Sequence, residues 1–247
     1  MSDSKTLRVF NLNAWGFRLV SSGLKEKKAR FEALRNVLAC NEYDVALLQE
    51  LWYRADYDLL KALFPHSSYL SDHYNNATGN IAPLGCSGLV ILSKFPLEEV
   101  EFLPFERRGG LITFDGEILV QKGVGRARIH LPMNGHTSLK VDLFTTHLVA
   151  YVGTKFRDWI NDKLRYKQAL ELHQMIKNSD ADIKILSGDF NTPPKVGNQE
   201  PYGLLASVMT DSLIDKFPNA SLDPDFATIG KKTPSSEIFL TKVGLLL

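Results

Sequence analysis

The sequence predicts a mixed α/β domain, and three observations support that fold class. First, 247 residues with 44% hydrophobic and 23% charged residues make a chain long enough to bury one large core. Second, short apolar stretches rich in β-branched residues alternate with longer stretches whose apolar residues follow helical spacing. Third, no internal repeat, low-complexity tract or linker-like run divides the chain. We therefore expect a single domain over residues 1–247.

The expected strands are short, apolar and followed by polar residues. In chain order they are Leu7–Leu12, Val45–Leu48, Gly88–Leu92, Leu139–Thr145 and Ile183–Leu186. The segment from Phe102 to His130 instead combines strand-like pieces with several glycines, which is typical of hairpins.

Two amphipathic helices are expected between these strands, because apolar residues recur there every three or four positions. In Glu26–Leu38 the apolar positions are Ala29, Phe31, Leu34, Val37 and Leu38. In Trp159–Ile176 they are Ile160, Leu164, Ala169, Leu172 and Ile176. Strands and helices therefore alternate over most of the chain.

Charge and cysteine content exclude several classes of protein. The chain carries 29 Lys and Arg against 28 Asp and Glu, a formal net charge of +1, whereas dedicated nucleic-acid binders usually have a strongly basic surface. Two cysteines, Cys40 and Cys86, are too few for a disulfide framework. The polar start Met1–Arg8 lacks a secretory signal, and no apolar run approaches the ~20 residues of a membrane-spanning helix. The chain as it stands is therefore expected to be soluble and cytoplasmic.

Polar side chains gather at the ends of the expected strands. Asn11 and Asn13 are two residues apart on the first strand, so both amides lie on one side of it and can share a ligand, with Asn13 in a supporting position. Asp189 and Asn191 have the same spacing directly after the last expected strand, and Glu50 directly follows the second. Open α/β sheets bind ligands at strand ends, so these residues are candidates for one site.

The chemistry of these residues favours phosphodiester hydrolysis. A single carboxylate with amide neighbours is typical of a magnesium site, since Mg²⁺ takes one or two carboxylates and keeps several waters. Glu50 is the expected metal ligand, with Asn11 beside it. Asp189 is expected to orient or deprotonate a water, Asn191 to hold a phosphate oxygen, and His147, at the end of a fourth strand, to donate to the developing charge.

Each of these residues also fits a structural role when it is taken singly. A strand-end Glu is most often a solvated charge, and Asp-Phe-Asn-Thr-Pro-Pro at 189–194 is a good turn sequence. Their joint position at the ends of four strands favours the functional interpretation.

Seven segments resemble, in their order, motifs of the endonuclease/exonuclease/phosphatase superfamily. They are FNLNAWG (10–16), LLQELW (47–52), GCSGLVILSKFPL (85–97), KGVGRA (122–127), TTHLVA (145–150), RYKQALEL (165–172) and SGDFNTPP (187–194). The first, third and fourth segments are similar to the neutral sphingomyelinase branch in particular. The similarity runs from about residue 7 to about residue 229.

The resemblance implies a four-layer α/β/β/α sandwich of the DNase I type, in which helices flank two packed mixed sheets. It assigns Glu50, Asn11, Asp189, Asn191 and His147 the same roles as the chemistry above. It also implies Mg²⁺ as the cofactor and sphingomyelin, or a related choline phospholipid, as the substrate at a cytosol-facing membrane surface. Hydrolysis would release ceramide and phosphocholine, and no nucleic-acid partner is expected.

Two late motifs of the superfamily, an Arg-x-Asp-Tyr strand and a terminal Ser-Asp-His, are absent from their expected places, and residues 231–247 are an unmatched tail. The sequence is therefore expected to be cut short relative to its family, without the last strand and the proton-accepting histidine. General acid–base catalysis contributes about 10²- to 10⁴-fold, so weak or absent turnover is expected.

Two other functions stay open at this point. A magnesium-dependent nuclease or another phosphatase of the superfamily would use the same residues, and a non-catalytic chain would only bind metal or lipid. Aromatic rings that attract a quaternary ammonium would favour the lipid enzyme, and Trp15, Trp52, Tyr53 and Tyr151 lie beside the motifs. Trp15 and Trp52 follow strands, however, which favours a place in the core.

Overall fold

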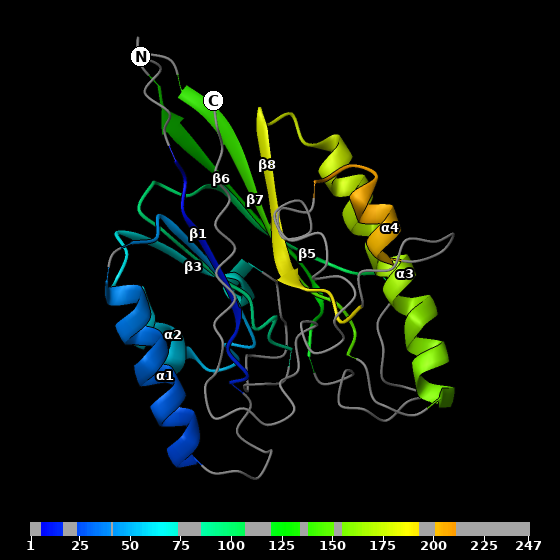
Figure 1. Ribbon diagram of the computed structural model, residues 1–247, viewed down its shortest axis with the longest axis horizontal. Coiled ribbons are helices and arrows are strands. Elements are labelled where there is room, and N and C mark those ends of the chain that lie inside the picture. The colour runs from blue at the N-terminus through cyan, green and yellow to red at the C-terminus, as the bar shows by residue number, and fades with distance from the viewer. Residues whose placement is uncertain are drawn as a thin grey trace.

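The computed structural model describes residues 6–16, 24–40, 42–73, 85–106, 120–133, 138–150, 155–192 and 201–210. Within them, strands and helices follow one another along the chain (Figure 1). The elements are β1 Val9–Asn13, α1 Leu24–Ala39, β2 Val45–Gln49, α2 Arg54–Lys61, β3 His66–Tyr69, the 3₁₀ helix η1 Leu70–His73, β4 Val90–Ser93, β5 Glu98–Pro104, β6 Gly123–Pro132, β7 Ser138–His147, α3 Lys155–Asn178, β8 Ile183–Asp189 and α4 Pro201–Ala206.

The first sheet contains four of the described strands in the order β1-β2-β4-β3. β1 is parallel to β2, with Val9 opposite Val45 and Asn13 opposite Gln49. β4 pairs antiparallel with both β2 and β3. Because β1 and β2 run in the same direction, their carboxyl ends lie together at one edge of the sheet.

The second sheet has the order β5-β6-β7-β8. β5, β6 and β7 are antiparallel neighbours, and β8 is parallel to β7. The register places His147 opposite Asp189, so these two residues also end neighbouring parallel strands side by side. Each sheet thus contributes one parallel pair whose carboxyl ends carry candidate site residues.

The two sheets pack face to face around a shared apolar core. Successive side chains of a strand point to opposite faces, so every second residue faces the other sheet. Val9, Val45 and Leu47 of the first sheet belong to one buried cluster with Leu143 and Ile185 of the second. This core holds the two parallel strand pairs against each other.

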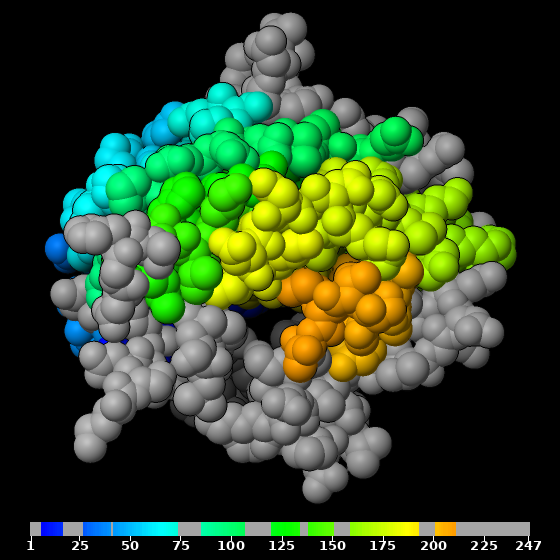
Figure 2. All heavy atoms as spheres, turned by 90° about the horizontal axis from the view of Figure 1, so that it is seen from above, coloured from blue at the N-terminus to red at the C-terminus, as the bar shows by residue number. Residues whose placement is uncertain are grey.

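Helices cover the outer face of each sheet. Phe10 and Leu48 of the first sheet pack with Leu34 of α1, and Phe144 of the second packs with Leu172 of α3. In Figure 2, α4 (orange) lies beside the yellow part of the chain, which includes the end of α3. The layers are helix, sheet, sheet and helix, which confirms the predicted α/β/β/α sandwich.

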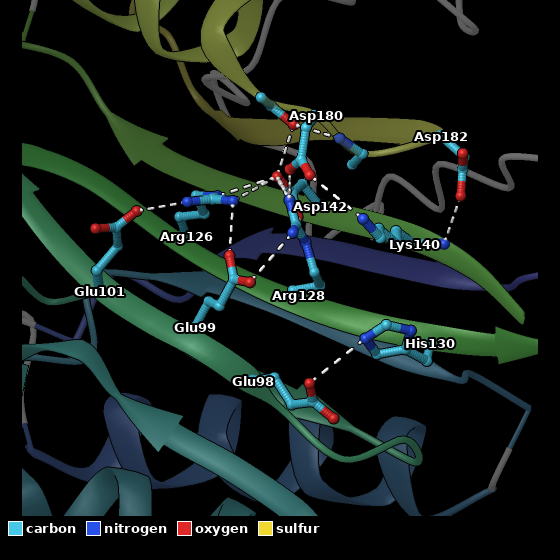
Figure 3. A network of polar contacts seen from close by, with 12 residues as sticks. Glu98, Glu99, Glu101, Arg126, Arg128, His130, Lys140, Asp142, Asp180 and Asp182 are labelled. Carbon is cyan, nitrogen blue, oxygen red and sulfur yellow. Dashed lines mark hydrogen bonds and ion pairs between the residues drawn. The ribbon is translucent and has the colours of Figure 1, made fainter.

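A network of ion pairs covers the helix-side face of the second sheet (Figure 3). The buried Asp142 of β7 accepts hydrogen bonds from Arg128 Nε at 2.7 Å, Arg126 Nε at 3.0 Å and Ser179 Oγ at 2.6 Å. Arg128 also donates to Asp180 at 2.5 Å. Burial alone would raise the pKa of Asp142, but the bonds from Arg128, Ser179 and Arg126 hold it below its usual value. The network ties β6 and β7 to the turn before β8.

The predicted strands and helices are present, with bounds that shift by a few residues. The shift that matters for the site is at β8, which continues to Asp189 instead of ending at Leu186, because its pairing with β7 extends to His147. The glycine-rich hairpin prediction corresponds to β5 and β6, which pair antiparallel. The sequence pattern predicts neither β3 nor α4, since β3 is the polar segment HSSY and α4 spans only six residues.

Several predictions concern features other than these elements. Cys40 and Cys86 are both free thiols, as expected from their number. Tyr151 and the unmatched tail at 231–247 lie outside the described residues. No helix in the described ranges combines the length and the apolar character needed to cross a membrane.

Candidate active site

Four strand ends, two from each sheet, carry the candidate site. Asn13 ends β1 and Asp189 ends β8, and both strands run downward in Figure 1. Asn13 Nδ2 donates to Asp189 Oδ2 at 2.8 Å and to Glu50 Oε1 at 2.9 Å. His147 ends β7 opposite Asp189. One amide nitrogen therefore joins a carboxylate of the first sheet to a carboxylate of the second.

The backbone is left-handed at three residues of this region, with φ of 47° at Trp15, 60° at Glu50 and 47° at Asn191. Such values are uncommon outside glycine and tend to cluster at functional sites. Strand alternation alone would place the Glu50 side chain with Leu48, toward the helices. The left-handed turn ends β2, and the carboxylate reaches Asn13 instead.

Gly16 and Trp15 support this turn. The Gly16 N–H donates to the Glu50 carbonyl at 3.0 Å, and a Cβ at Gly16 would lie only 2.3 Å from the same oxygen. The Trp15 N–H donates to Asn13 Oδ1 at 2.9 Å. Because Oδ1 accepts this bond, the Asn13 amide presents its nitrogen to the two carboxylates.

Asp189 and Asn191 are fixed by the end of β7. Asp189 Oδ1 accepts from the Asn191 N–H at 3.0 Å, and the Leu148 N–H donates to the Asp189 carbonyl at 2.9 Å. Asn191 Nδ2 donates to the Leu148 carbonyl at 3.1 Å. Burial alone would raise the pKa of Asp189, but His147 and the bonds from Asn13 and Asn191 bring it below its usual value. Asp189 is therefore ionised at neutral pH.

His147 is buried beside Asp189, with Nε2 3.9 Å from Asp189 Oδ2. Its Nδ1 is buried and has no hydrogen-bond partner among the described residues. Burial and the charge of Lys122 lower the pKa of His147, and Asp189 opposes them more weakly. The imidazole is therefore neutral at pH 7 and can donate one N–H to a negatively charged oxygen.

Gln49 is a site residue that sequence reasoning missed. Its Nε2 donates to Asn11 Oδ1 at 2.9 Å and to Thr145 Oγ1 of the second sheet at 3.1 Å. Asn11 therefore meets Gln49, whereas Glu50 is bonded to Asn13, so the two amides of β1 have different partners. The alternation of Val45, Leu47 and Gln49 could have revealed the residue, because these positions share the face toward the second sheet.

Lys122 is a second missed residue. It is buried directly before β6, and its Nζ donates to the Leu148 carbonyl at 3.3 Å. Its charge lowers the pKa values of Glu50, His147 and Asp189. The available signal was its place at the head of the KGVGRA segment.

The donor set suits a magnesium ion. Burial raises the pKa of Glu50, the Asn13 bond and Lys122 lower it, and the like charge of Asp189 raises it further. A divalent cation would offset this repulsion between the carboxylates. In the part of the chain that the structure describes, no three His, Cys, Asp or Glu side chains form a metal cage. Mg²⁺ does not need one, because it binds through one or two carboxylates, waters and phosphate oxygens.

The aromatic candidates differ in their surroundings. Trp52 is buried, in agreement with its expected place in the core. Trp15 is 53% exposed, so its expected place in the core was wrong. The backbone at Trp15 is left-handed, so the strand alternation that favours a core position does not continue to this residue. The Lys27 ammonium lies 4.7 Å from the ring centroid of Tyr53, so the Tyr53 ring already faces a cation of the chain.

Comparison with known proteins adds a family and a set of relatives. The model of the Endonuclease/Exonuclease/phosphatase family matches residues 10–197. Inositol phosphosphingolipids phospholipase C of Schizosaccharomyces pombe is 29% identical over 218 residues, which are 86% of this chain and 47% of that protein. Sphingomyelin phosphodiesterase 2 of Rattus norvegicus is 32% identical over 195 residues, 78% of this chain and 42% of the relative. The chain thus spans less than half the length of these relatives.

The fold has solved counterparts as well. A mutant of beta toxin from Staphylococcus aureus, solved with bound magnesium ions, superposes with a TM-score of 0.60 at 18% sequence identity. The superposition covers 79% of this chain and 68% of the toxin chain. At this identity the likeness concerns the fold.

Proposed function

Because the chain belongs to the Endonuclease/Exonuclease/phosphatase family, we propose that it is a magnesium-dependent phosphodiesterase that acts on sphingomyelin or a related choline phospholipid. The observation that carries this proposal is the amide of Asn13, which holds the carboxylates of Glu50 and Asp189 together between the two sheets. The named relatives, a phospholipase C and a sphingomyelin phosphodiesterase, support the lipid as the substrate class.

In this proposal Glu50 would hold Mg²⁺, with Asn11 as the nearby amide and Asn13 in a supporting position. Asn13 keeps the two carboxylates close, and Gln49 orients Asn11 through the bond to Asn11 Oδ1. Bound Mg²⁺ would supply positive charge to the phosphate oxygens of the substrate.

Asp189, Asn191 and His147 handle the reacting groups. The ionised carboxylate of Asp189 accepts a proton from a water whose oxygen attacks phosphorus. The bond from phosphorus to the ceramide oxygen breaks, and that oxygen regains a proton, so one water yields ceramide and phosphocholine. Neutral His147 donates to a non-bridging oxygen, and Asn191 and Lys122 stabilise the same negative charge.

Two exposed tryptophans support a membrane surface as the place of reaction. Trp15 and Trp159 are 53% and 56% exposed. The Arg30 guanidinium lies 5.2 Å from the Trp15 ring centroid, and the Lys163 ammonium lies 3.7 Å from that of Trp159. Trp15 follows β1 and Trp159 lies near the start of α3, so both belong to the end of the sandwich that carries the strand ends. An indole paired with a cation suits the boundary between lipid headgroups and acyl chains.

The test uses the full chain with sphingomyelin in mixed micelles and measures phosphocholine release. We expect slow release that requires Mg²⁺ and stops in EDTA, and we expect Glu50→Gln to abolish it. Glu32→Gln is the matched control, because Glu32 is an exposed residue of α1 whose carboxylate lies 3.8 Å from Lys28. No Mg²⁺-dependent release, or full release by Glu50→Gln, would overturn the proposal.

A magnesium-dependent nuclease is the competing function, since it would use the same side chains. Plasmid DNA incubated with the same protein and Mg²⁺ distinguishes the two. Nicking without phosphocholine release would favour the nuclease, whereas the near-neutral formal charge of +1 favours the lipid enzyme.

A further inference from the structure

Three polar side chains of α3 hold the segment that directly follows His147. Asn161 Nδ2 donates to the Ala150 carbonyl at 3.1 Å, and Arg165 Nη1 donates to the Val149 carbonyl at 3.1 Å. Gln168 Oε1 accepts from the Val149 N–H at 3.0 Å. All three side chains are buried. They bind backbone groups of Val149 and Ala150, which follow the end of β7 and are not paired in the sheet.

The spacing of these residues places them on one face of the helix. Positions 161, 165 and 168 follow the four- and three-residue steps that bring side chains together on a helix surface. Farther along α3, Ala169, Leu172 and Ile176 pack on the second sheet. The start of the helix thus presents amides and a guanidinium to the end of β7, where an apolar face would leave backbone groups unsatisfied.

The same short segment is held from its other side by candidate site residues. The Leu148 carbonyl accepts from Asn191 Nδ2 at 3.1 Å and from Lys122 Nζ at 3.3 Å. The Leu148 N–H donates to the Asp189 carbonyl at 2.9 Å. Residues 148–150 therefore lie between α3 and the site, and a shift of this segment would move His147 and Asn191 together.

We infer that Asn161, Arg165 and Gln168 are positioning residues for phosphodiester hydrolysis, an inference that rests on the proposed function. They fix the 148–150 segment and thereby set where His147 and Asn191 meet the phosphate. None of the three touches the reacting atoms. Small displacements of catalytic groups are costly, since an error of about 1 Å can lower a rate about 10²-fold.

The first test is Gln168→Leu, which removes the acceptor of the Val149 N–H at nearly constant volume. We expect kcat to fall about tenfold or more with KM changed less than about twofold, because the misplaced groups act in the transition state. Gln168→Glu keeps an acceptor oxygen and should recover most of kcat. Gln174→Leu is the matched control, because Gln174 is an exposed residue of α3 that donates to Asn178 Oδ1 at 2.8 Å.

Two further measurements need no substrate. Hydrogen exchange of the Val149 amide should become faster in Gln168→Leu, and the ring resonances of His147 should shift, whereas Gln174→Leu should change neither. Asn161→Asp, which removes the donor to Ala150, is the second variant if Gln168→Leu does not fold, and it should shift the same resonances. The inference is overturned if these variants fold, leave the His147 resonances unchanged and retain kcat. Absent turnover in the unmodified chain, by contrast, would count against the proposed function and leave the His147 and Val149 measurements valid.

Discussion

Replacement of Asn13 by leucine is the sharpest test of the hydrogen bonds through which Asn13 links the two sheets. Asn13 Nδ2 lies 2.9 Å from Glu50 Oε1 and 2.8 Å from Asp189 Oδ2, so these oxygens are at most about 6 Å apart. Asn13→Leu removes the donor that both share. The two charges repel by about 3 kcal/mol at an effective dielectric constant of about 20, in the unmodified chain and in the variant alike. The variant loses two hydrogen bonds to charged groups, and each such bond contributes about 1.5 to 3 kcal/mol. We therefore expect the free energy of unfolding to fall by about 3 kcal/mol at pH 7 without Mg²⁺.

The effect should depend on Mg²⁺ and on pH. A cation held by Glu50 would offset the carboxylate charge that the missing donor leaves, so saturating Mg²⁺ should reduce the deficit to about 1 kcal/mol. The pKa of Glu50 is already raised by burial and should rise further in the variant. A carboxylate with a raised pKa gains a proton as the pH falls, so the deficit should be smaller at pH 5 than at pH 8.

Urea unfolding followed by tryptophan fluorescence measures these differences. Asn178→Leu is the control. Asn178 is an exposed residue at the end of α3, and its Oδ1 accepts a hydrogen bond from Gln174. That variant should stay within about 0.5 kcal/mol of the unmodified chain at every Mg²⁺ concentration. An Asn13→Leu deficit that is the same with and without Mg²⁺ would refute a cation at Glu50, and no deficit would refute the stabilising role of the Asn13 hydrogen bonds.

Three other changes test separate parts of the structure. Gly16→Ala would place a Cβ 2.3 Å from the Glu50 carbonyl, so we expect Mg²⁺ binding measured by calorimetry to weaken by about tenfold. Asp142→Asn would leave Arg128 without its buried partner, and chemical unfolding at pH 7 should show a loss of about 3 kcal/mol. Since the pKa of Asp142 is held below its usual value, its contribution is complete above about pH 4 and is lost as the pH falls through the folded pKa, so the difference should shrink in acid. Trp159→Ser should reduce binding to phosphatidylcholine vesicles in a sedimentation assay by about tenfold, and undiminished binding would remove Trp159 from the membrane contact.

The sequence predicts well those elements that carry their own signal. Val45–Leu48 and Ile183–Leu186 are apolar runs with β-branched residues, and both are strands. β3 has no such run: His66–Tyr69 is a strand because it pairs with β4, and partners far along the chain are not visible in local composition. The extension of β8 to Asp189 has the same origin, because it follows the pairing with β7.

The site shows the same division between local and distant causes. The spacing of Asn11 and Asn13, and of Asp189 and Asn191, is visible in the sequence, and Asn13 and Asp189 end β1 and β8. Which amide meets which carboxylate is not visible, because it depends on how the two sheets pack. Lys122 belongs to neither spacing pattern, and only the folded chain brings its ammonium to the Leu148 carbonyl.

The position of the site follows from two parallel registers that meet across the core. Asn13 lies opposite Gln49 in the first sheet, and His147 lies opposite Asp189 in the second. A slip of one residue in either pair would turn its side chains to the opposite face of the sheet. Asn13 Nδ2 and Gln49 Nε2 then bridge the sheets, to Asp189 and to Thr145. The arrangement of the two carboxylates therefore depends on the packing of the two sheets. For this reason we expect both the activity and the free energy of unfolding to fall in Asn13→Leu.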